Sequence, residues 1–504
     1  MQINVLEYLE QTALRLPNKV AFYGEEEALT FCQLLHNARA IGTQLIQDGH
    51  TKKSIVVFMS KKPKTIAAFL GVIYAGCYYV PLDHEMPRCR VERILHMLQP
   101  AACICDESTL PLVKELENTG AVYSCSSLCR GEIDEQALRA IRHRQIDTDP
   151  IYIVFTSGST GEPKGVVGCH RAVIDYIENL CQVLRFNQDT VFGNQAPLCY
   201  DACLKEILPT LKYGASTYLI PQKLFLQPVR LVEYLNEKKV NTLCWVVSAL
   251  TFLSSLKTFE RVKPKYVHTV AFASEVFPIR QLKLWREALP GARFINLYGP
   301  TETTGICCYY EVDRDFSEEE SLPVGRPFRN TDIILLNGKN QVPAQGEQGE
   351  ICIRGTRLTH GYYSSQEKTR EAFVQNPLNN FYPEIIYRTG DIGKYNDRGE
   401  LVFLSRKDNQ IKHMGHRIEL GEIEMAADTH KDVQSACCVY DLITKKLTLF
   451  YTGMVSPPEL TELLKQKLPR YMLPYRIIPL QAMPLTPNGK IDRNLLKQRS
   501  TEHG

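Results

Sequence analysis

The stretch YIVFTSGSTGEPKG, residues 152–165, begins as an apolar strand-like run and continues as a loop rich in glycine and hydroxyl side chains. The loop holds three glycines, four serine or threonine residues and one lysine. Glycine lets a backbone approach its ligand closely, and backbone N–H groups, hydroxyls and an ammonium group all donate hydrogen bonds to phosphate oxygens. The composition therefore favours a phosphate-binding loop, with a solvated surface turn as the alternative.

The spacing of this loop excludes two common phosphate motifs. A Walker A loop requires Ser or Thr directly after its lysine, whereas Gly165 follows Lys164. The loop also lacks the GxGxxG spacing of dinucleotide-binding folds. Its identity must come from the rest of the chain.

Length and charge narrow the class of protein. A chain of 504 residues is expected to form roughly two to four domains. The net charge is +3, with 59 basic and 56 acidic residues, so no electrostatic footprint for nucleic acid is present and a small-molecule partner is expected. The opening residues lack the basic start and apolar core of a signal peptide, which predicts a cytoplasmic protein.

The seventeen cysteines are scattered and include no CxxC pair, so we interpret them as reduced apolar side chains rather than a disulfide framework. The sequence also has no HExxH motif and no Cys/His cluster, which argues against a zinc site. An uncharged stretch at 65–82 approaches the length of a membrane span. Because Gly71, Gly76 and Pro81 interrupt it, we expect a buried helix followed by a core strand, with no membrane insertion.

Strand-like and helix-like segments alternate through the first two thirds of the chain, which predicts layered α/β subdomains with largely parallel sheets. From about residue 331 short strands separated by turns predict a β-rich subdomain. The last hundred residues read as a small α+β unit, in which Ser456 is placed to cap a helix that begins with Pro457 and Pro458. We therefore predict an N-terminal domain at 1–405 and a small C-terminal domain at 406–504.

Five motifs, taken in order, give the chain a family resemblance. The chain resembles the adenylate-forming superfamily in AGCYYVPLD at 75–83, the loop at 152–165, NLYGPTETT at 296–304, the long run at 387–424 and MPLTPNGKIDRNLL near the end. That superfamily includes acyl-CoA synthetases, luciferases and the adenylation domains of nonribosomal peptide synthetases. The motifs run from about residue 50 to 495, nearly the whole chain.

The resemblance assigns ATP and magnesium contacts. It implies that the first loop holds the β- and γ-phosphates through Thr156, Ser157, Gly158, Ser159, Thr160, Gly161 and Lys164. It also implies that Asn296 and Tyr298 bind adenine, that Thr301 contacts the α-phosphate and that Glu302 binds Mg²⁺, a hard cation suited to carboxylate oxygen. Asp391 and Arg406 are the expected ribose or phosphate contacts, with a surface ion pair between them as the alternative.

The C-terminal domain carries the remaining expected catalytic groups. The resemblance implies that Lys490 lies between the substrate carboxylate and the α-phosphate, which requires the small domain to swing onto the large one. It also implies a hinge at Asp408, and a rotation that replaces Lys490 by a face around Lys412 and Gly415 for thioester formation. An ordinary interdomain loop is the alternative for the hinge.

An acidic residue stands where amino-acid-activating members bind the substrate ammonium. Asp201 occurs in a variant of the usual motif, since Tyr200 and Cys203 replace its phenylalanine and serine. Burying a carboxylate at an apolar pocket without a cation is costly, so we expect an amino acid substrate. Lys205, four residues on, is a candidate for binding a side-chain carboxylate, with an i,i+4 ion pair to Asp201 or a solvated lysine as alternatives.

Further positions match the substrate pocket of the family. They are Ala202, Ser248, Val270, Phe272, Leu297, Gly305 and Ile306. Phe272 and Leu297 are expected to narrow the pocket and favour a small or slender substrate. The chain also resembles freestanding D-alanine:carrier-protein ligases, but Ala273 stands where that subfamily has cysteine, so D-alanine itself is not supported.

The expected reaction joins an amino acid to ATP as aminoacyl-AMP with release of pyrophosphate. The acyl group then passes to the phosphopantetheine thiol of a carrier protein, which we expect on a separate chain because no serine motif for that arm is found. An acyl- or aryl-acid:CoA ligase of the same fold is one alternative. A catalytically silent binding or scaffold member is another.

Overall fold

The computed structural model describes residues 2–158, 162–442, 444–486 and 491–502. Contacts divide the chain into two compact units. The first contains residues 1–84, 98–154 and 165–407, and the second contains 85–97, 155–164 and 408–504. The second unit thus includes two segments that the sequence assigns to the large domain. The predicted domain limits and the hinge at Asp408 stay predictions.

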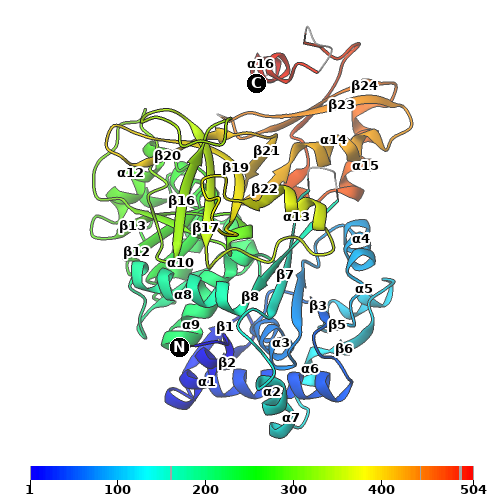
Figure 1. The fold of residues 1–504 in the computed structure, drawn as a ribbon, viewed down its shortest axis with the longest axis vertical. Helices are drawn as coiled ribbons and strands as arrows, with labels where there is room; N and C mark the ends of the chain where they lie inside the picture. The colour runs from blue at the N-terminus through cyan, green and yellow to red at the C-terminus, as the bar shows by residue number, and fades with distance from the viewer. Residues whose placement is uncertain (1, 159–161, 443, 487–490, 503–504) are drawn as a thin grey trace. The chain divides into compact units, whose positions relative to one another are not determined.

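A six-stranded sheet builds one half of the first unit (Figure 1). Its strands, in spatial order, are β6 (Ala121–Ser124), β5 (Ala102–Cys105), β3 (Ser54–Phe58), β4 (Tyr78–Leu82), β7 (Pro150–Thr156) and β8 (Lys164–Cys169). The pairs from β6 through to β7 are parallel. Its helices are α2 (Phe31–Gln47), α3 (Pro63–Tyr74), α5 (Leu110–Lys114), α6 (Cys125–Leu128) and α7 (Glu135–Arg142).

The uncharged stretch at 65–82 forms most of α3 and the core strand β4, as the sequence predicts. Every residue of α3 except Lys64 is buried, so its apolar character serves packing against α2. Gly71 is required there, because an added Cβ would lie 2.5 Å from the side chain of Ile41 on α2. In the part of the chain that the structure describes, no helix is both long and apolar enough to cross a membrane.

A nine-stranded sheet forms the other half of the first unit. Its spatial order is β15 (Arg326–Pro327), β14 (Cys308–Glu311), β13 (Arg293–Tyr298), β12 (Thr269–Ala273), β11 (Thr242–Val246), β9 (Val191–Asn194), β10 (Ser216–Leu219), β1 (Val20–Tyr23) and β2 (Ala28–Thr30). The strands from β13 through to β1 are parallel, and antiparallel pairs close both edges. The associated helices are α1 (Leu6–Arg15), α8 (His170–Leu184), α9 (Leu204–Tyr213), α10 (Pro228–Glu237), α11 (Val247–Ser255) and α12 (Ile279–Ala288).

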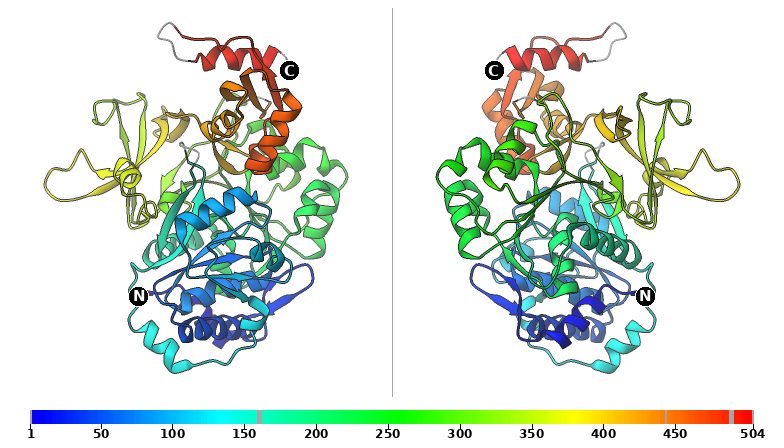
Figure 2. Two further views of the ribbon diagram at one scale, coloured as in Figure 1. Left: turned by 90° about the vertical axis from the view of Figure 1, so that its right-hand side faces the viewer. Right: turned by 90° about the vertical axis from the view of Figure 1, so that its left-hand side faces the viewer.

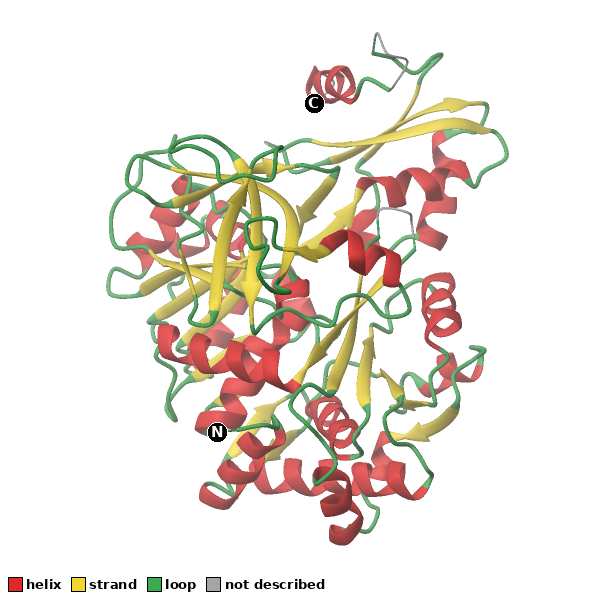
Figure 3. Ribbon diagram, viewed as in Figure 1, coloured by secondary structure: helices red, strands yellow, loops and turns green. Residues whose placement is uncertain are grey.

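Two apolar cores cover the two faces of this sheet. Along β12, Ala271 and Ala273 belong to the core that also contains α8 and α9, whereas Val270 and Phe272 belong to the core of α10–α12. The alternation follows from the period of two along a strand. Figure 3 shows helices and strands alternating through this part of the molecule, which confirms the predicted layered α/β class.

The predicted β-rich subdomain is an antiparallel sheet of β16 (Thr331–Leu336), β17 (Gly349–Gly355), β19 (Ile385–Tyr395), β18 (Phe373–Gln375) and β20 (Leu401–Arg406). The short helix α13 (Gln366–Ala372) precedes β18. Figure 2 shows the yellow-green strands of this sheet projecting away from the green helices of the nine-stranded sheet.

The second unit has its own core. It contains the hairpin of β21 (Gln410–His413) and β22 (His416–Glu419), and the sheet of β23 (Val433–Tyr440), β24 (Leu447–Gly453) and β25 (Arg476–Pro479). Its helices are α4 (Arg88–Leu98), α14 (Leu420–Asp428), α15 (Pro457–Lys467) and α16 (Arg493–Glu502). Ser456 caps α15 by accepting a hydrogen bond from the backbone N–H of Glu459, as the sequence predicts.

Candidate active site

The phosphate-loop motif lies in the second unit, directly after β7. Gly158 is required by its surroundings, because an added Cβ would lie 2.0 Å from the carbonyl oxygen of Glu162. The hydroxyls of Thr156 and Ser157 donate to backbone carbonyls, of Lys164 and Arg417 respectively. Three predicted contacts, Ser159, Thr160 and Gly161, lie outside the described residues, as does Lys490.

The expected adenine and ribose contacts meet in the first unit. Tyr298 ends β13, and its hydroxyl donates a 2.5 Å hydrogen bond to Asp391 on β19. The other oxygen of Asp391 accepts a 2.8 Å hydrogen bond from Arg406 on β20. The side chains of Arg406 and Asp391 are 15% and 4% exposed, so this pair lies in the interior rather than on the surface. Asn296, two residues before Tyr298, donates to the carbonyl of Pro323.

Glu302, the expected Mg²⁺ ligand, is fully buried in the short turn Thr301–Thr303 that follows β13. Its Oε1 atom accepts a 2.7 Å hydrogen bond from the hydroxyl of Tyr362, and its backbone carbonyl accepts from the N–H of Thr359. A carboxylate held in this way is the type of ligand that Mg²⁺ prefers. Tyr362 therefore orients the candidate ligand, a role that sequence reasoning missed.

Asp201 lies beside these groups at the start of the turn that leads into α9. Burial raises the pKa of its carboxyl, and the charge of Glu302 adds to that effect, while hydrogen bonding with Thr301 and the charge of Lys205 oppose it. Its Oδ2 atom is enclosed and has no hydrogen-bond partner among the described residues. The arrangement is suited to a cationic group that would hydrogen bond to this oxygen, a partner that the described residues do not provide.

Lys205 is 3% exposed, on the first turn of α9. It is therefore not a solvated surface lysine. Its charge acts on the carboxyl groups of both Asp201 and Glu206. No ion pair within 4 Å joins Lys205 to Asp201 in the described part of the chain. We call residues 195–205, which carry both charges, the anchor loop.

The remaining pocket positions do not all come together. Ala202, Leu297 and Ile306 belong to the core beside the anchor loop, whereas Val270 and Phe272 face the opposite side of the nine-stranded sheet. Strand alternation places two alanines on the anchor-loop side in their stead, Ala271 and Ala273. The ring of Phe272 packs edge-on against Phe277 in the other core, and the expectation that it narrows the pocket stays a prediction.

Two pocket positions have weaker support. Ser248 is half-buried in the first turn of α11. Gly305 follows the Glu302 turn with a φ of +87°, a conformation that favours glycine. An added Cβ at Gly305 would lie 3.5 Å from the Tyr176 ring, so the backbone passes close to α8.

The residues expected at the hinge and in the thioester step lie in the second unit. Asp408 accepts a hydrogen bond from the N–H of Gln410 at the start of β21. Lys412 lies on β21, and the two-residue turn to β22 is Met414 and Gly415, with φ of +52° and +80°. Positive φ at both turn positions is typical of a tight hairpin. The hairpin gives Gly415 a local structural role as well as the expected functional one.

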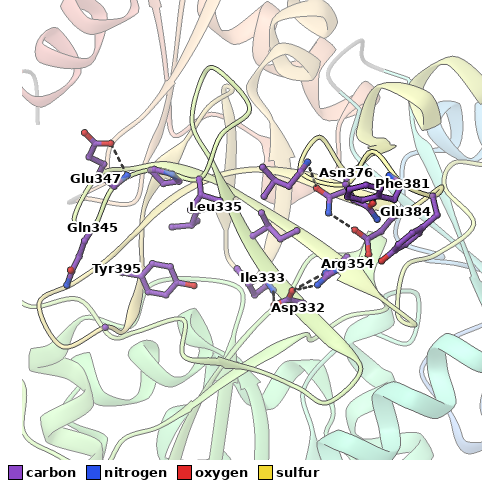
Figure 4. Close-up of a pocket in the computed structure, with 18 residues that line it drawn as sticks. Asp332, Ile333, Leu335, Gln345, Glu347, Arg354, Asn376, Phe381, Glu384 and Tyr395 are labelled. Carbon is purple, nitrogen blue, oxygen red and sulfur yellow. Dashed lines mark hydrogen bonds and ion pairs between the residues drawn. The ribbon is translucent and has the colours of Figure 1, made fainter.

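A separate pocket of about 700 Å³ lies in the β-rich subdomain (Figure 4). We call it the subdomain pocket. Its charged groups satisfy one another: Arg354 pairs with Asp332 at 2.9 Å and with Glu384, and Asn376 donates to Glu384. None of the predicted site residues lines it.

Comparison with known proteins identifies the family and the relatives of this chain. A family model described as AMP-binding enzyme matches residues 9–363. Tyrocidine synthase 1 of Brevibacillus parabrevis is 32% identical over 502 residues, which cover 98% of this chain and 45% of that protein. The chain thus spans less than half of that relative. D-alanine--D-alanyl carrier protein ligase of Bacillus licheniformis is 30% identical over 521 residues, covering 99% of this chain and all of that protein.

Solved structures share the fold. The Vibrio cholerae adenylation domain AlmE, in complex with glycyl-adenosine-5'-phosphate, aligns with a TM-score of 0.86 at 21% identity, over 100% of this chain and 98% of that one. The o-succinylbenzoate CoA synthetase MenE of Bacillus subtilis aligns with a TM-score of 0.84 at 22% identity, over 98% of both chains. The chain therefore belongs to the AMP-binding enzyme family, within the adenylate-forming ANL superfamily.

Proposed function

We propose that this protein activates an amino acid with ATP and then transfers it to the phosphopantetheine thiol of a separate carrier protein. The amino acid assignment rests on one observation, the enclosed and unpartnered carboxylate oxygen of Asp201 among the described residues. An enclosed carboxylate oxygen without a hydrogen-bond partner in the described chain calls for a cation, and a substrate ammonium supplies one. An acid without an amine would leave that oxygen unpaired.

In the first step, a carboxylate oxygen of the amino acid attacks the α-phosphorus of ATP. The bond from that phosphorus to the oxygen bridging to the β-phosphate breaks, and pyrophosphate leaves. Tyr298 and Asp391 would hold the nucleoside, Thr301 would contact the α-phosphate, and Asp201 would fix the ammonium so that the carboxylate points at phosphorus. The phosphate loop and Lys490 are proposed to hold pyrophosphate and the reacting oxygens.

Glu302 is the proposed Mg²⁺ ligand. The ion would supply positive charge against the phosphate oxygens when it is bound. The chain's own contribution is the buried carboxylate, oriented by the hydroxyl of Tyr362 at 2.7 Å.

In the second step, the pantetheine sulfur attacks the acyl carbon, AMP leaves, and the thiol proton is lost to solvent. Asp408 is the proposed hinge for the change of conformation, with Lys412 and Gly415 facing the thioester reaction. Support for a separate carrier comes from D-alanine--D-alanyl carrier protein ligase, which this chain matches over its whole length and whose name states that partner.

Lys205 points to the class of amino acid. A lysine that is 3% exposed and makes no ion pair with Asp201 is suited to a second anion in the pocket. We propose a substrate with a side-chain carboxylate, of the aspartate or glutamate type. The two alanines on β12 leave more room on that wall than a phenylalanine would.

Amino-acid-dependent exchange of pyrophosphate into ATP, measured over a panel of amino acids and simple carboxylic acids, tests the assignment. We expect exchange with amino acids, strongest with acidic ones. Exchange with fatty or aryl acids alone would contradict the proposal and favour a CoA ligase.

A further inference from the structure

A lysine outside the five motifs is hydrogen bonded to the base of the anchor loop. Lys61 follows β3 of the six-stranded sheet, and its ammonium donates to three backbone carbonyls: Asn194 at 3.0 Å, Gln195 at 3.2 Å and Ile220 at 3.4 Å. An ammonium group has three N–H donors, so the three carbonyls match it in full. Asn194 ends β9 and Ile220 follows β10, so Lys61 joins the ends of two neighbouring strands of the nine-stranded sheet.

A hydrogen bond joins the two residues that flank the anchor loop, Asn194 and Glu206. The side-chain amide of Asn194, the residue before the loop, donates to Oε2 of Glu206, the residue after it. Both residues are 0% exposed. The hydrogen bond thus clamps a segment whose two ends are twelve positions apart in sequence, and Asp201 lies inside that segment.

Lys61 also balances the charge of the clamp. Glu206 is fully buried and its Oε1 atom has no hydrogen-bond partner in the described part of the chain. Burial raises the pKa of Glu206 to about 7, opposed by the charge of Lys205, the hydrogen bond from Asn194 and the charge of Lys61. Burial lowers the pKa of Lys61 to about 8, and the charge of Glu206 opposes that shift. Removal of Lys61 would take away one of the two cations, Lys61 and Lys205, that act on the buried carboxylate of Glu206, and would leave three carbonyls without their donor.

We propose that Lys61 is a positioning residue for the substrate. Through the carbonyls of Asn194 and Gln195 and the charge of Glu206, it fixes the clamp that holds Asp201 where the substrate ammonium binds. The proposal rests on amino acid activation as the function. The hydrogen bonds of Lys61 go to backbone carbonyls outside the proposed ATP contacts, so we expect its effect to fall on the amino acid.

Three single variants test this role. Lys61→Met keeps the length of the side chain and removes its donors, whereas Lys61→Arg keeps a cation and donors. Lys62→Met is the matched control, because this neighbouring lysine makes a 3.6 Å ion pair with Asp106, away from the clamp. The measurements are KM for the best amino acid, KM for ATP and kcat, all in the pyrophosphate exchange reaction.

We expect Lys61→Met to raise KM for the amino acid about 10-fold or more, with KM for ATP changed by less than about 2-fold. Lys61→Arg should recover most of that loss, and Lys62→Met should behave as the unaltered protein. Equal changes in both KM values, or no change in either, would overturn the proposal. So would a Lys62→Met variant as impaired as Lys61→Met.

Two further results keep the test decisive. If Lys61→Met does not fold, the pair Lys61→Met with Glu206→Gln removes both charges and keeps an acceptor for Asn194. The folded pair should still show the selective rise in KM for the amino acid, and normal amino acid KM in it would overturn the positioning role. If the unaltered protein activates no amino acid, the proposed function fails first, which is distinct from a normal enzyme with an indifferent Lys61→Met variant.

Discussion

The anchor loop and the subdomain pocket both contain charged side chains of the first unit. They differ in whether those charges are paired with one another. In the subdomain pocket, Arg354 is paired with Asp332 and Glu384 (Figure 4). In the anchor loop, Asp201 keeps an enclosed oxygen without a hydrogen-bond partner among the described residues, and Lys205 is buried without an ion pair to it. Charges that satisfy one another stabilise a fold, whereas buried charges that lack partners call for a ligand.

We expect the largest effect on activity from a substitution of Asp201. Asp201→Ala removes the proposed partner of the substrate ammonium, and loss of one partner of a desolvated charge pair costs several kcal/mol. We expect amino-acid-dependent pyrophosphate exchange to fall about 100-fold or more. Asp332→Ala is the control in the subdomain pocket and should leave exchange nearly unchanged. Similar losses in both variants would mean that the two clusters do not differ in function.

The second effect concerns the magnesium site. Tyr362→Phe removes the hydroxyl that orients Glu302, and loss of a group that orients a metal ligand typically costs 10- to 100-fold in metal affinity. We expect the Mg²⁺ concentration for half-maximal exchange to rise about 10-fold. Tyr382→Phe, on an exposed tyrosine of the subdomain pocket, should not shift it. An unchanged Mg²⁺ dependence in Tyr362→Phe would contradict the assignment of Glu302.

The third effect is on substrate choice. Lys205→Met should reduce the preference for acidic over neutral amino acids by about 10-fold, because it removes the proposed partner of the side-chain carboxylate. The measurement is kcat/KM for one acidic and one neutral amino acid of similar size. If the ratio of the two kcat/KM values is unchanged in Lys205→Met, Lys205 does not bind the substrate side chain.

The fourth effect is on pH dependence. The pKa of Asp201 is raised in the free protein, mainly by burial. Its ionised form is therefore disfavoured until the substrate ammonium arrives, and the stabilisation that the protonated form gives the free protein is lost as pH rises through this raised pKa. KM for the amino acid should fall as pH rises through the same range. Asp201→Asn should abolish this trend, and an unchanged trend in that variant would assign it to another group.

We expect the smallest effect from a substitution in the subdomain pocket. Arg354→Met breaks two ion pairs that are partly exposed, and such pairs contribute about 1 kcal/mol or less to stability. We expect a small decrease in the free energy of unfolding and unchanged KM values for ATP and the amino acid. A selective rise in either KM would give the subdomain pocket a functional role.

Much of the fold could be predicted from the sequence because its signals are local. The alternation of apolar runs and helical segments gave the layered α/β class, and the uncharged stretch at 65–82 formed the predicted helix and strand. Ser456 caps α15 because hydroxyl and proline preferences act within one turn. The family motifs assigned Tyr298, Asp391 and Arg406 to nucleotide binding. In the structure these residues are joined by hydrogen bonds, although they come from three strands.

The rest depended on contacts between distant residues. Tyr362 lies sixty positions from Glu302, and Lys61 lies well over a hundred positions from Asn194, so no local pattern links them. The sequence also could not show which face of the nine-stranded sheet Val270 and Phe272 take. A shift of one residue along β12 exchanges the two faces of the sheet, and only the cores reveal which face each side chain takes.

The most direct test of the account compares an amino acid with its own deaminated analogue in pyrophosphate exchange, using the unaltered protein and Asp201→Ala. The account predicts that the unaltered protein favours the amino acid by about 100-fold, and that Asp201→Ala loses most of that preference. Equal activity of the unaltered protein with both acids, or a preference that survives in Asp201→Ala, would contradict it.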